Sequence, residues 1–326
     1  MVSLFKSRSP ATIVWLLILS IVVHSHFIAY SPVIKTTGTA GLITDFINKY
    51  FVIFSPAVII IIYHGIIVFQ SLRLNHLLAD YRMYSRVTYL PAMTYILLTG
   101  LFTEWSNLTS ALIGNILVIW FYSKIIYLNS SRTPKTSLFN IGLLISISTI
   151  LYHPLVLLLI PAFFALMILR PFVITEWLIL LIGLITPFYF LTSYLYLTNN
   201  IASIRSYVPG FKFYVLLLNF SISSITSIIF IIVIFFIGLY YWQQENKRLL
   251  IQVRNNWVIL IVIMITMLPL PFIYHGENVE NLIVCIVSGS PIIAKGFLAA
   301  KRKSLPSLMF WILIILSVLK NWQIMK

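Results

Sequence analysis

Long apolar runs, each close to the length that crosses a lipid bilayer, follow one another along almost the whole chain. About 20 apolar residues in a helix span about 30 Å of hydrocarbon. The runs are continuous and do not alternate between polar and apolar residues, which favours helices over strands. The sequence therefore predicts an all-α, polytopic transmembrane helical bundle that forms one domain over residues 1–326.

Composition agrees with this prediction, because 60% of the residues are hydrophobic and only 9% are charged. A water-soluble chain of this length could not cover its surface with so few charges. Eleven segments are expected to cross the membrane: 11–30, 50–70, 88–103, 108–123, 137–152, 154–169, 175–198, 213–242, 257–274, 281–299 and 306–322. Pro154 disfavours a continuous helix through 137–169, so this stretch is either two tilted spans or one re-entrant pair.

The positions of the 22 Lys and Arg residues predict an orientation for the bundle. Fifteen of them fall in alternate gaps on one side and six on the other, with Lys295 inside a span. By the positive-inside rule, the N-terminus is expected inside and the C-terminus outside. The basic residues are spread over many loops, which excludes a nucleic-acid partner and points to membrane lipids with anionic headgroups.

The expected outer side holds most of the carboxylates that could carry out acid–base chemistry. Asp45 lies in the first outer loop and could be a catalytic base, although a solvated loop charge is the alternative. Glu277 and Glu280 are three residues apart and share a helix face, so they could bind a cation or act on a substrate. Their alternative role is to stabilise a helix N-terminus.

Three basic residues on the same side are candidates for substrate binding: Arg205, Lys212 and His275. The planar fork of an arginine suits a lipid-linked phosphate, and a solvated turn is the alternative for Arg205 and Lys212. No metal site is expected, because the only cysteine, Cys285, lies in an apolar run. No cofactor is expected either, since nucleotide-binding motifs are missing from the sequence.

Histidines and hydroxyls inside the expected spans have functional and structural interpretations. His24 and His26 are two residues apart, which predicts different faces of one helix. His64 is expected to be neutral and bonded to a neighbouring helix. A stripe of polar residues could line a path, or could join helices by hydrogen bonds; it comprises Asn219, Ser223, Thr226 and Ser227.

Three further expectations concern the segment 71–87 and the next-to-last span. Residues 71–87 suggest a short helix in the membrane interface, with a solvated connector as the alternative. Ser288-Gly289-Ser290-Pro291 suggests a broken or kinked helix of the kind that exposes backbone to a ligand. Lys295 is expected to reach the inner surface beside Lys301.

Two stretches carry a resemblance to a known family: RPFVITEWLILLIGLITPF at 170–188 and ENLIVCIVSGSPIIAKGF at 280–297. Together with the number of spans, they resemble a multi-pass inner-membrane family of unknown function from gliding-type bacteria. The resemblance implies a location in the bacterial inner (cytoplasmic) membrane.

A weaker similarity is to polyprenyl-dependent membrane glycosyltransferases and polysaccharide polymerases. It is carried by Tyr152-His153-Pro154 with the following LVLLLIPAFF, and by an acidic residue in the first outer loop, here Asp45. It implies transfer of a sugar from a polyprenyl-phosphate-linked donor at the outer face, with Arg205 and Lys212 on the phosphate. The alternatives are a transporter or lipid flippase, and a non-catalytic membrane subunit that binds other envelope proteins.

Overall fold

The computed structural model describes residues 1–7, 9–32, 34, 41–129, 131, 133–210, 222–273, 279–300 and 304–322. Helices dominate these ranges, and the β-contact found within them is an isolated bridge between Ile34 and Leu108. The predicted all-α class is therefore confirmed.

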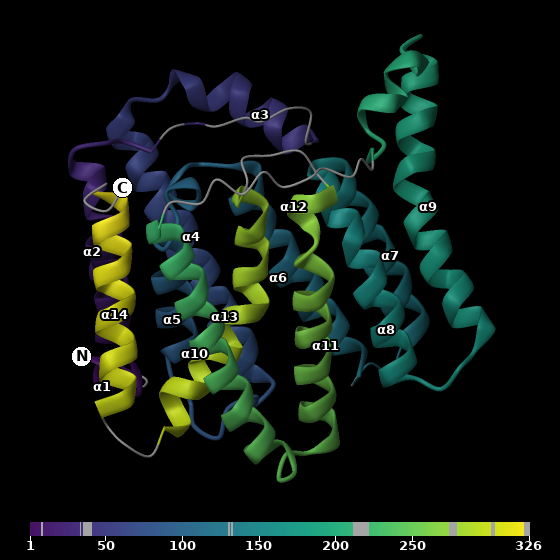
Figure 1. The fold of residues 1–326 in the computed structure, drawn as a ribbon. Coiled ribbons are helices and arrows are strands. Elements are labelled where there is room, and N and C mark those ends of the chain that lie inside the picture. The colour runs from purple at the N-terminus through teal and green to yellow at the C-terminus, as the bar shows by residue number, and fades with distance from the viewer. Residues whose placement is uncertain are drawn as a thin grey trace.

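The described helices and 3₁₀ turns (η) follow one another as shown in Figure 1. In chain order they are α1 (Val2–Phe5), α2 (Ala11–Val23), η1 (Ser25–Ile28), α3 (Leu42–Tyr50), η2 (Phe51–Ile53), α4 (Pro56–Asp80), α5 (Leu90–Thr99), η3 (Thr103–Ser106), α6 (Ser110–Leu128), α7 (Pro134–Leu151), η4 (His153–Leu158), α8 (Leu159–Leu169), α9 (Ile174–Leu197), η5 (Ile201–Ser206), α10 (Ile222–Asn246), α11 (Ile251–Met267), α12 (Leu270–Ile273), η6 (Glu280–Val284), α13 (Cys285–Ala299) and α14 (Ser304–Asn321).

Eight of the described helical stretches are long and apolar enough to cross a membrane. They are Pro56–Asp80, Ser110–Leu128, Pro134–Leu151, Ile174–Leu197, Ser224–Asn246, Ile251–Ile273, Glu280–Ala299 and Ser304–Asn321. Three shorter apolar stretches, Ala11–Val23, Leu90–Thr99 and His153–Leu169, overlap the other expected spans. The chain is thus a multi-pass membrane protein by the length and composition of its helices.

The predicted interruption near Pro154 is confirmed. Helix α7 ends at Leu151, Tyr152 is extended, and the chain continues as the 3₁₀ turn η4 before α8 begins at Leu159. Pro154 has no amide hydrogen to donate to the carbonyl four residues earlier, so α7 cannot continue through it as an unbroken α-helix. Helix α8 then runs in the opposite direction to α7 (Figure 1) and packs on α11.

The expectation of a separate interfacial helix at 71–87 is wrong. Helix α4 continues without a break from Pro56 to Asp80, and residues 81–89 form a turn in which Arg82 has a φ of 49°. Leu74, Leu77 and Leu78 are buried, so packing against the other helices extends α4 beyond the expected span.

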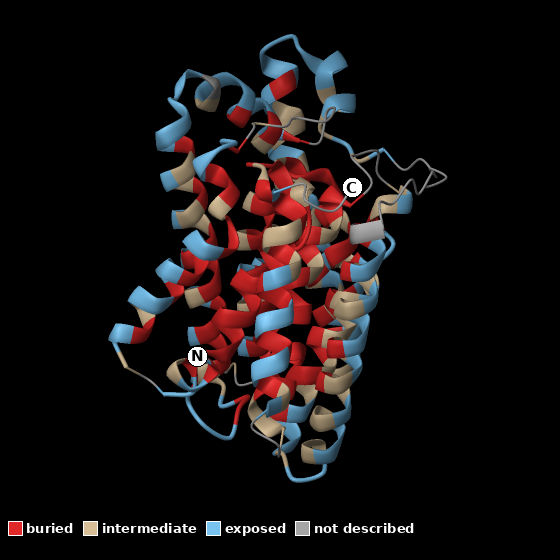
Figure 2. Ribbon diagram, turned by 60° about the vertical axis from the view of Figure 1, so that its left-hand side comes forward, coloured by how far each residue is buried: buried red, intermediate tan, exposed pale blue. Residues whose placement is uncertain are grey.

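Helices α5 and α13 form the centre of the bundle, where Figure 2 shows mostly buried residues. Every residue of α5 is buried, and so is every residue of α13 from Ile286 to Phe297. A Cβ atom at Gly238 of α10 would overlap the carbonyl oxygen of Ile292, so glycine allows α10 and α13 to approach closely.

Of the two expectations for Ser288–Pro291, a broken or a kinked helix, the break is wrong, because α13 runs continuously through Pro291, while the kink stays a prediction. Two side chains outside α13 hydrogen-bond to its carbonyls at this point. Thr94 Oγ1 donates to the carbonyl of Ser290 at 2.9 Å, and the Tyr84 hydroxyl donates to that of Pro291 at 2.5 Å. These bonds join α13 to α5 and to the turn that follows α4.

Helix α9 stands at the edge of the bundle and packs mainly on α7 (Figure 1). The contact depends on Gly142 of α7 and Gly183 of α9. A Cβ atom at Gly142 would overlap the carbonyl oxygen of Leu180, and one at Gly183 would overlap that of Phe139.

The described segments between spans that carry most of the Lys and Arg residues lie at one end of the bundle (Figure 1). This end, called the basic end here, is formed by residues 1–7, 81–89, 170–173 and 247–250. The amide of Tyr89 donates to the carbonyl of Phe5 at 2.9 Å, which joins two of these segments. The opposite end carries α3, η5 and α12. The alternation of gaps predicted from the sequence therefore agrees with the fold.

Candidate functional site at the end opposite the basic segments

Helix α3 lies across the opposite end of the bundle (Figure 1) and is amphipathic. Its N-cap residue Gly41 has a φ of 114°, which favours glycine, and a Cβ atom there would crowd the carbonyl of Leu151 in α7. The hydroxyls of Thr44 and Ser110 are 2.8 Å apart and join α3 to the start of α6. These contacts hold α3 over the ends of α6 and α7.

A cavity of about 510 Å³ lies beside α3. Its lining residues come from α3, α6 and α7: Leu42, Ile43, Asp45, Phe46, Lys49, Tyr50, Ile113 and Leu151. Among the described lining residues, Asp45 and Lys49 are charged and one helical turn apart, and the others are apolar apart from the Tyr50 hydroxyl. Both charged side chains are exposed, and the Lys49 Nζ lies 5.3 Å from the centre of the Tyr50 ring.

Asp45 has no hydrogen bond or ion pair with any residue in the described ranges. The exposed apolar side chains of Phe46, Ile53 and Phe54 lie on or just after α3. A carboxylate that can accept a proton thus stands beside a surface suited to lipid.

Of the other predicted site residues that the structure describes, neither Arg205 nor Glu280 lines this cavity. Arg205 is exposed in η5, beyond the end of α9, and does not line it. Glu280 begins η6 and is buried. Lys212, His275 and Glu277 lie outside the described residues.

The surroundings of Glu280 are those of a packed helix end. The carbonyl of Val279 accepts a hydrogen bond from Trp105 Nε1 at 2.8 Å, and Asn281 Oδ1 accepts one from the Tyr152 hydroxyl at 2.6 Å. No group of three or more His, Cys, Asp or Glu side chains within the described ranges could hold a metal ion.

A cluster of three histidines at the same end was not expected. The chain leaves the α-helical path after Val23, so His24 and His26 do not diverge as two helical residues would. The ring centres of His24 and His26 are 6.3 Å apart, and those of His24 and His64 are 5.8 Å apart. The prediction that the two lie apart on one helix is wrong.

Hydrogen bonds tie these histidines to their surroundings. His64 Nδ1 and Ser20 Oγ are 2.8 Å apart, which confirms the expected bond to a neighbouring helix. His24 Nε2 is 3.1 Å from the Tyr63 hydroxyl, which donates to the carbonyl of Trp105.

The sequence also missed an ion pair near the basic end. Lys295 does not reach the surface but is fully buried, and its Nζ donates to Glu245 Oε2 at 2.6 Å. The same Nζ lies 5.0 Å from the centre of the Tyr84 ring and 5.3 Å from that of Trp257. Helix α10 extends to Asn246, which brings Glu245 beside α13 rather than leaving it in a loop.

Comparison with protein-family models, curated proteins and solved structures found no match to this chain.

Proposed function

We propose that this protein is a membrane-embedded glycosyl-transfer enzyme of envelope glycan assembly, which takes its sugar from a polyprenyl-phosphate-linked donor. The observation that carries this proposal is Asp45 in a cavity that is otherwise largely apolar and lies beside the amphipathic helix α3. A lipid-linked sugar has the same combination of an apolar chain and a polar head.

In the proposed reaction Asp45 is the general base. It accepts the proton of an acceptor hydroxyl, whose oxygen then attacks the anomeric carbon of the donor sugar. A new glycosidic C–O bond forms and the bond between that carbon and the phosphate oxygen breaks. The electron pair leaves with the polyprenyl phosphate, so a nearby cation favours the reaction.

Lys49 is the nearest candidate for that cation, because it lines the same cavity as Asp45. Arg205, which the sequence also suggested for this role, would need to approach the donor from outside the cavity. The proposed topology has eleven spans in the bacterial inner membrane, with the basic end and the N-terminus inside and α3 outside. The donor would then be used at the outer face.

Two other functions remain alternatives. A transporter or lipid flippase was suggested in part by an interrupted helix at Ser288–Pro291, and the continuity of α13 removes that support. A non-catalytic subunit of an envelope complex is compatible with the short loops, but it gives no reason for a carboxylate in the α3 cavity. The geometry therefore favours the enzyme.

The test uses the full-length protein in liposomes, a polyprenyl-phosphate-linked radiolabelled glucose and a lipid extract of the native membrane as acceptor. We expect label transfer, reduced about a hundredfold or more by Asp45→Asn, since general-base catalysis contributes about 10²–10⁴-fold. The matched control is Asp80→Asn, which neutralises an exposed carboxylate at the basic end and should leave transfer unchanged. If cells carrying Asp45→Ala and Arg205→Ala together retained all their envelope glycans, the proposal would be wrong.

A further inference from the structure

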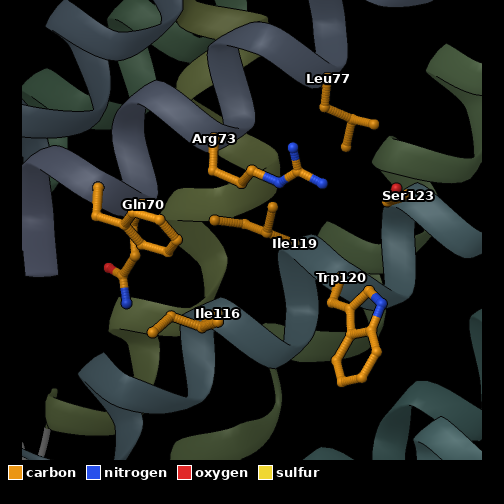
Figure 3. Close-up of a pocket in the computed structure, with 8 residues that line it drawn as sticks. Gln70, Arg73, Leu77, Ile116, Ile119, Trp120 and Ser123 are labelled. Atoms are coloured by element: carbon orange, nitrogen blue, oxygen red, sulfur yellow. The ribbon is translucent and has the colours of Figure 1, made fainter.

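A second cavity, a groove of about 180 Å³, lies between α4 and α6 on the side of the bundle. Figure 3 shows its lining side chains, with Gln70, Arg73 and Leu77 on α4 facing Ile116, Ile119, Trp120 and Ser123 on α6. Phe69 completes the lining. Both helices are long and apolar enough to cross a membrane, so this groove lies within the spanning part of the bundle.

The groove opens outward rather than into the protein core. The side chain of Phe69 is 57% exposed and that of Trp120 is 49% exposed. Because exposed aromatic residues on spanning helices meet lipid, the groove is open to lipid along its side.

Arg73 brings a positive charge into this apolar surface. It is exposed and has no hydrogen bond or ion pair with any residue that the structure describes. It precedes the end of α4 at Asp80 by seven residues, which corresponds to about 10 Å along the helix axis. An ionisable residue at such a position costs free energy, and a ligand that neutralises it reduces the cost.

The polar groups of the groove are arranged for one anion. In Figure 3 the guanidinium of Arg73 extends toward the part of the groove where Ser123 lies. No lining residue carries a carboxylate. Gln70 contributes little, because its amide nitrogen donates to the carbonyl of Leu112 and its oxygen accepts from Tyr95.

We infer that this groove binds an anionic phospholipid from the leaflet at the basic end. The phosphodiester accepts hydrogen bonds from Arg73 and Ser123, and an acyl chain lies along Phe69, Ile116 and Trp120. One guanidinium matches the single negative charge of a phosphodiester, whereas a diphosphate would call for more cations. This site is independent of the proposed function, because it lies on the side of the bundle and not in the α3 cavity.

The test measures lipid binding by native mass spectrometry of the full-length protein in detergent. The probes are palmitoyl-oleoyl phosphatidylglycerol, the diacylglycerol with the same chains, and a polyprenyl monophosphate. We expect phosphatidylglycerol to bind about tenfold more tightly than diacylglycerol, since a charged hydrogen bond contributes about that much affinity.

Arg73→Gln should weaken phosphatidylglycerol binding about tenfold. Arg254→Gln is the matched control, because Arg254 is an exposed arginine of α11 that does not line the groove. Equal losses in both variants, or no loss with Arg73→Gln, would overturn the assignment. Tighter, Arg73-dependent binding of the polyprenyl monophosphate would overturn the choice of phospholipid.

A further variant keeps the charge, in case Arg73→Gln does not fold. Ser123→Phe retains Arg73 and fills the groove, so it should also weaken phosphatidylglycerol binding. Unchanged binding by this variant would show that the lipid lies elsewhere.

Discussion

Helices α9 and α13 have nearly equal mean hydropathy but very different places in the molecule. Only 17% of the spanning part of α9 is buried, compared with 78% of the spanning part that contains α13. Hydropathy therefore predicts that both enter the membrane, and it does not predict which of them lies at the centre.

Small and polar residues make the difference between the two helices. Helix α13 has Ser288, Gly289, Ser290 and Lys295 within its buried stretch. Helix α9 consists mostly of large apolar and aromatic residues, and it faces lipid except where Gly183 meets α7. In lipid, which is as apolar as leucine, small and polar residues drive helices together, so their position indicates the interior of a membrane bundle.

The sharpest test of this comparison is the same substitution in both helices. Phe297 of α13 is fully buried, whereas Phe190 of α9 is 66% exposed. Phe297→Ala should lower the free energy of unfolding by about 3–5 kcal/mol, because it leaves a cavity among protein side chains. Phe190→Ala should change it by less than about 0.5 kcal/mol, because lipid fills the space. Denaturation of each variant in mixed micelles measures the two values, and equal losses would contradict the comparison.

The second-largest expected difference between the two helices concerns the ion pair that each of them forms. Glu245→Gln leaves the fully buried Lys295 without its carboxylate partner. We expect this to lower the free energy of unfolding by about 2–3 kcal/mol. The loss is smaller than usual for a broken buried ion pair because the rings of Tyr84 and Trp257 still interact with the ammonium group.

Near the start of α9, Arg170 pairs with Glu176 at 3.2 Å and has a side-chain exposure of 24%. Glu176→Gln should therefore lower the free energy of unfolding less than Glu245→Gln does, because solvent reaches the arginine that has lost its partner. Adding Lys295→Met to Glu245→Gln should recover most of the lost stability. A double variant as unstable as Glu245→Gln alone would show that the charge of Lys295 is not the cause. The same denaturation experiment measures all of these changes.

Much of the helical layout could be predicted from the sequence, because each span must satisfy its own backbone hydrogen bonds and so needs a continuous apolar run. Prolines and the basic residues between apolar runs also predicted where the chain turns, as at Pro154. The extension of α4 to Asp80 could not be predicted, because it depends on packing of Leu74 and Leu78 against other helices.

The site was harder to predict for the same reason. Asp45 could be selected because it is a carboxylate in the first loop, but its cavity is formed by Ile113 and Leu151, far away in the chain. The pairing of Lys295 with Glu245 depends on the approach of α10 to α13 at Gly238, which no local pattern reveals.

The smallest expected effect concerns one hydroxyl that contacts α13. The hydroxyl of Tyr84 donates to the carbonyl of Pro291, so Tyr84→Phe should cost about 1 kcal/mol at neutral pH. Tyr189→Phe in α9 is the matched control and should cost nothing measurable, because Tyr189 is 65% exposed.

The cost of Tyr84→Phe should also depend on pH. Burial, together with the nearby Tyr122 and Glu245, raises the pKa of Tyr84 well above its usual value. An unfolded tyrosine ionises near pH 10, so the contribution of Tyr84 to stability is complete below that pH and is lost as the pH rises beyond it. Wild-type protein should therefore lose more stability than the Tyr84→Phe variant between about pH 9 and 11, while Tyr189→Phe should follow the wild type. Parallel pH profiles for all three proteins would show that the Tyr84 hydroxyl is not held in its neutral form against α13.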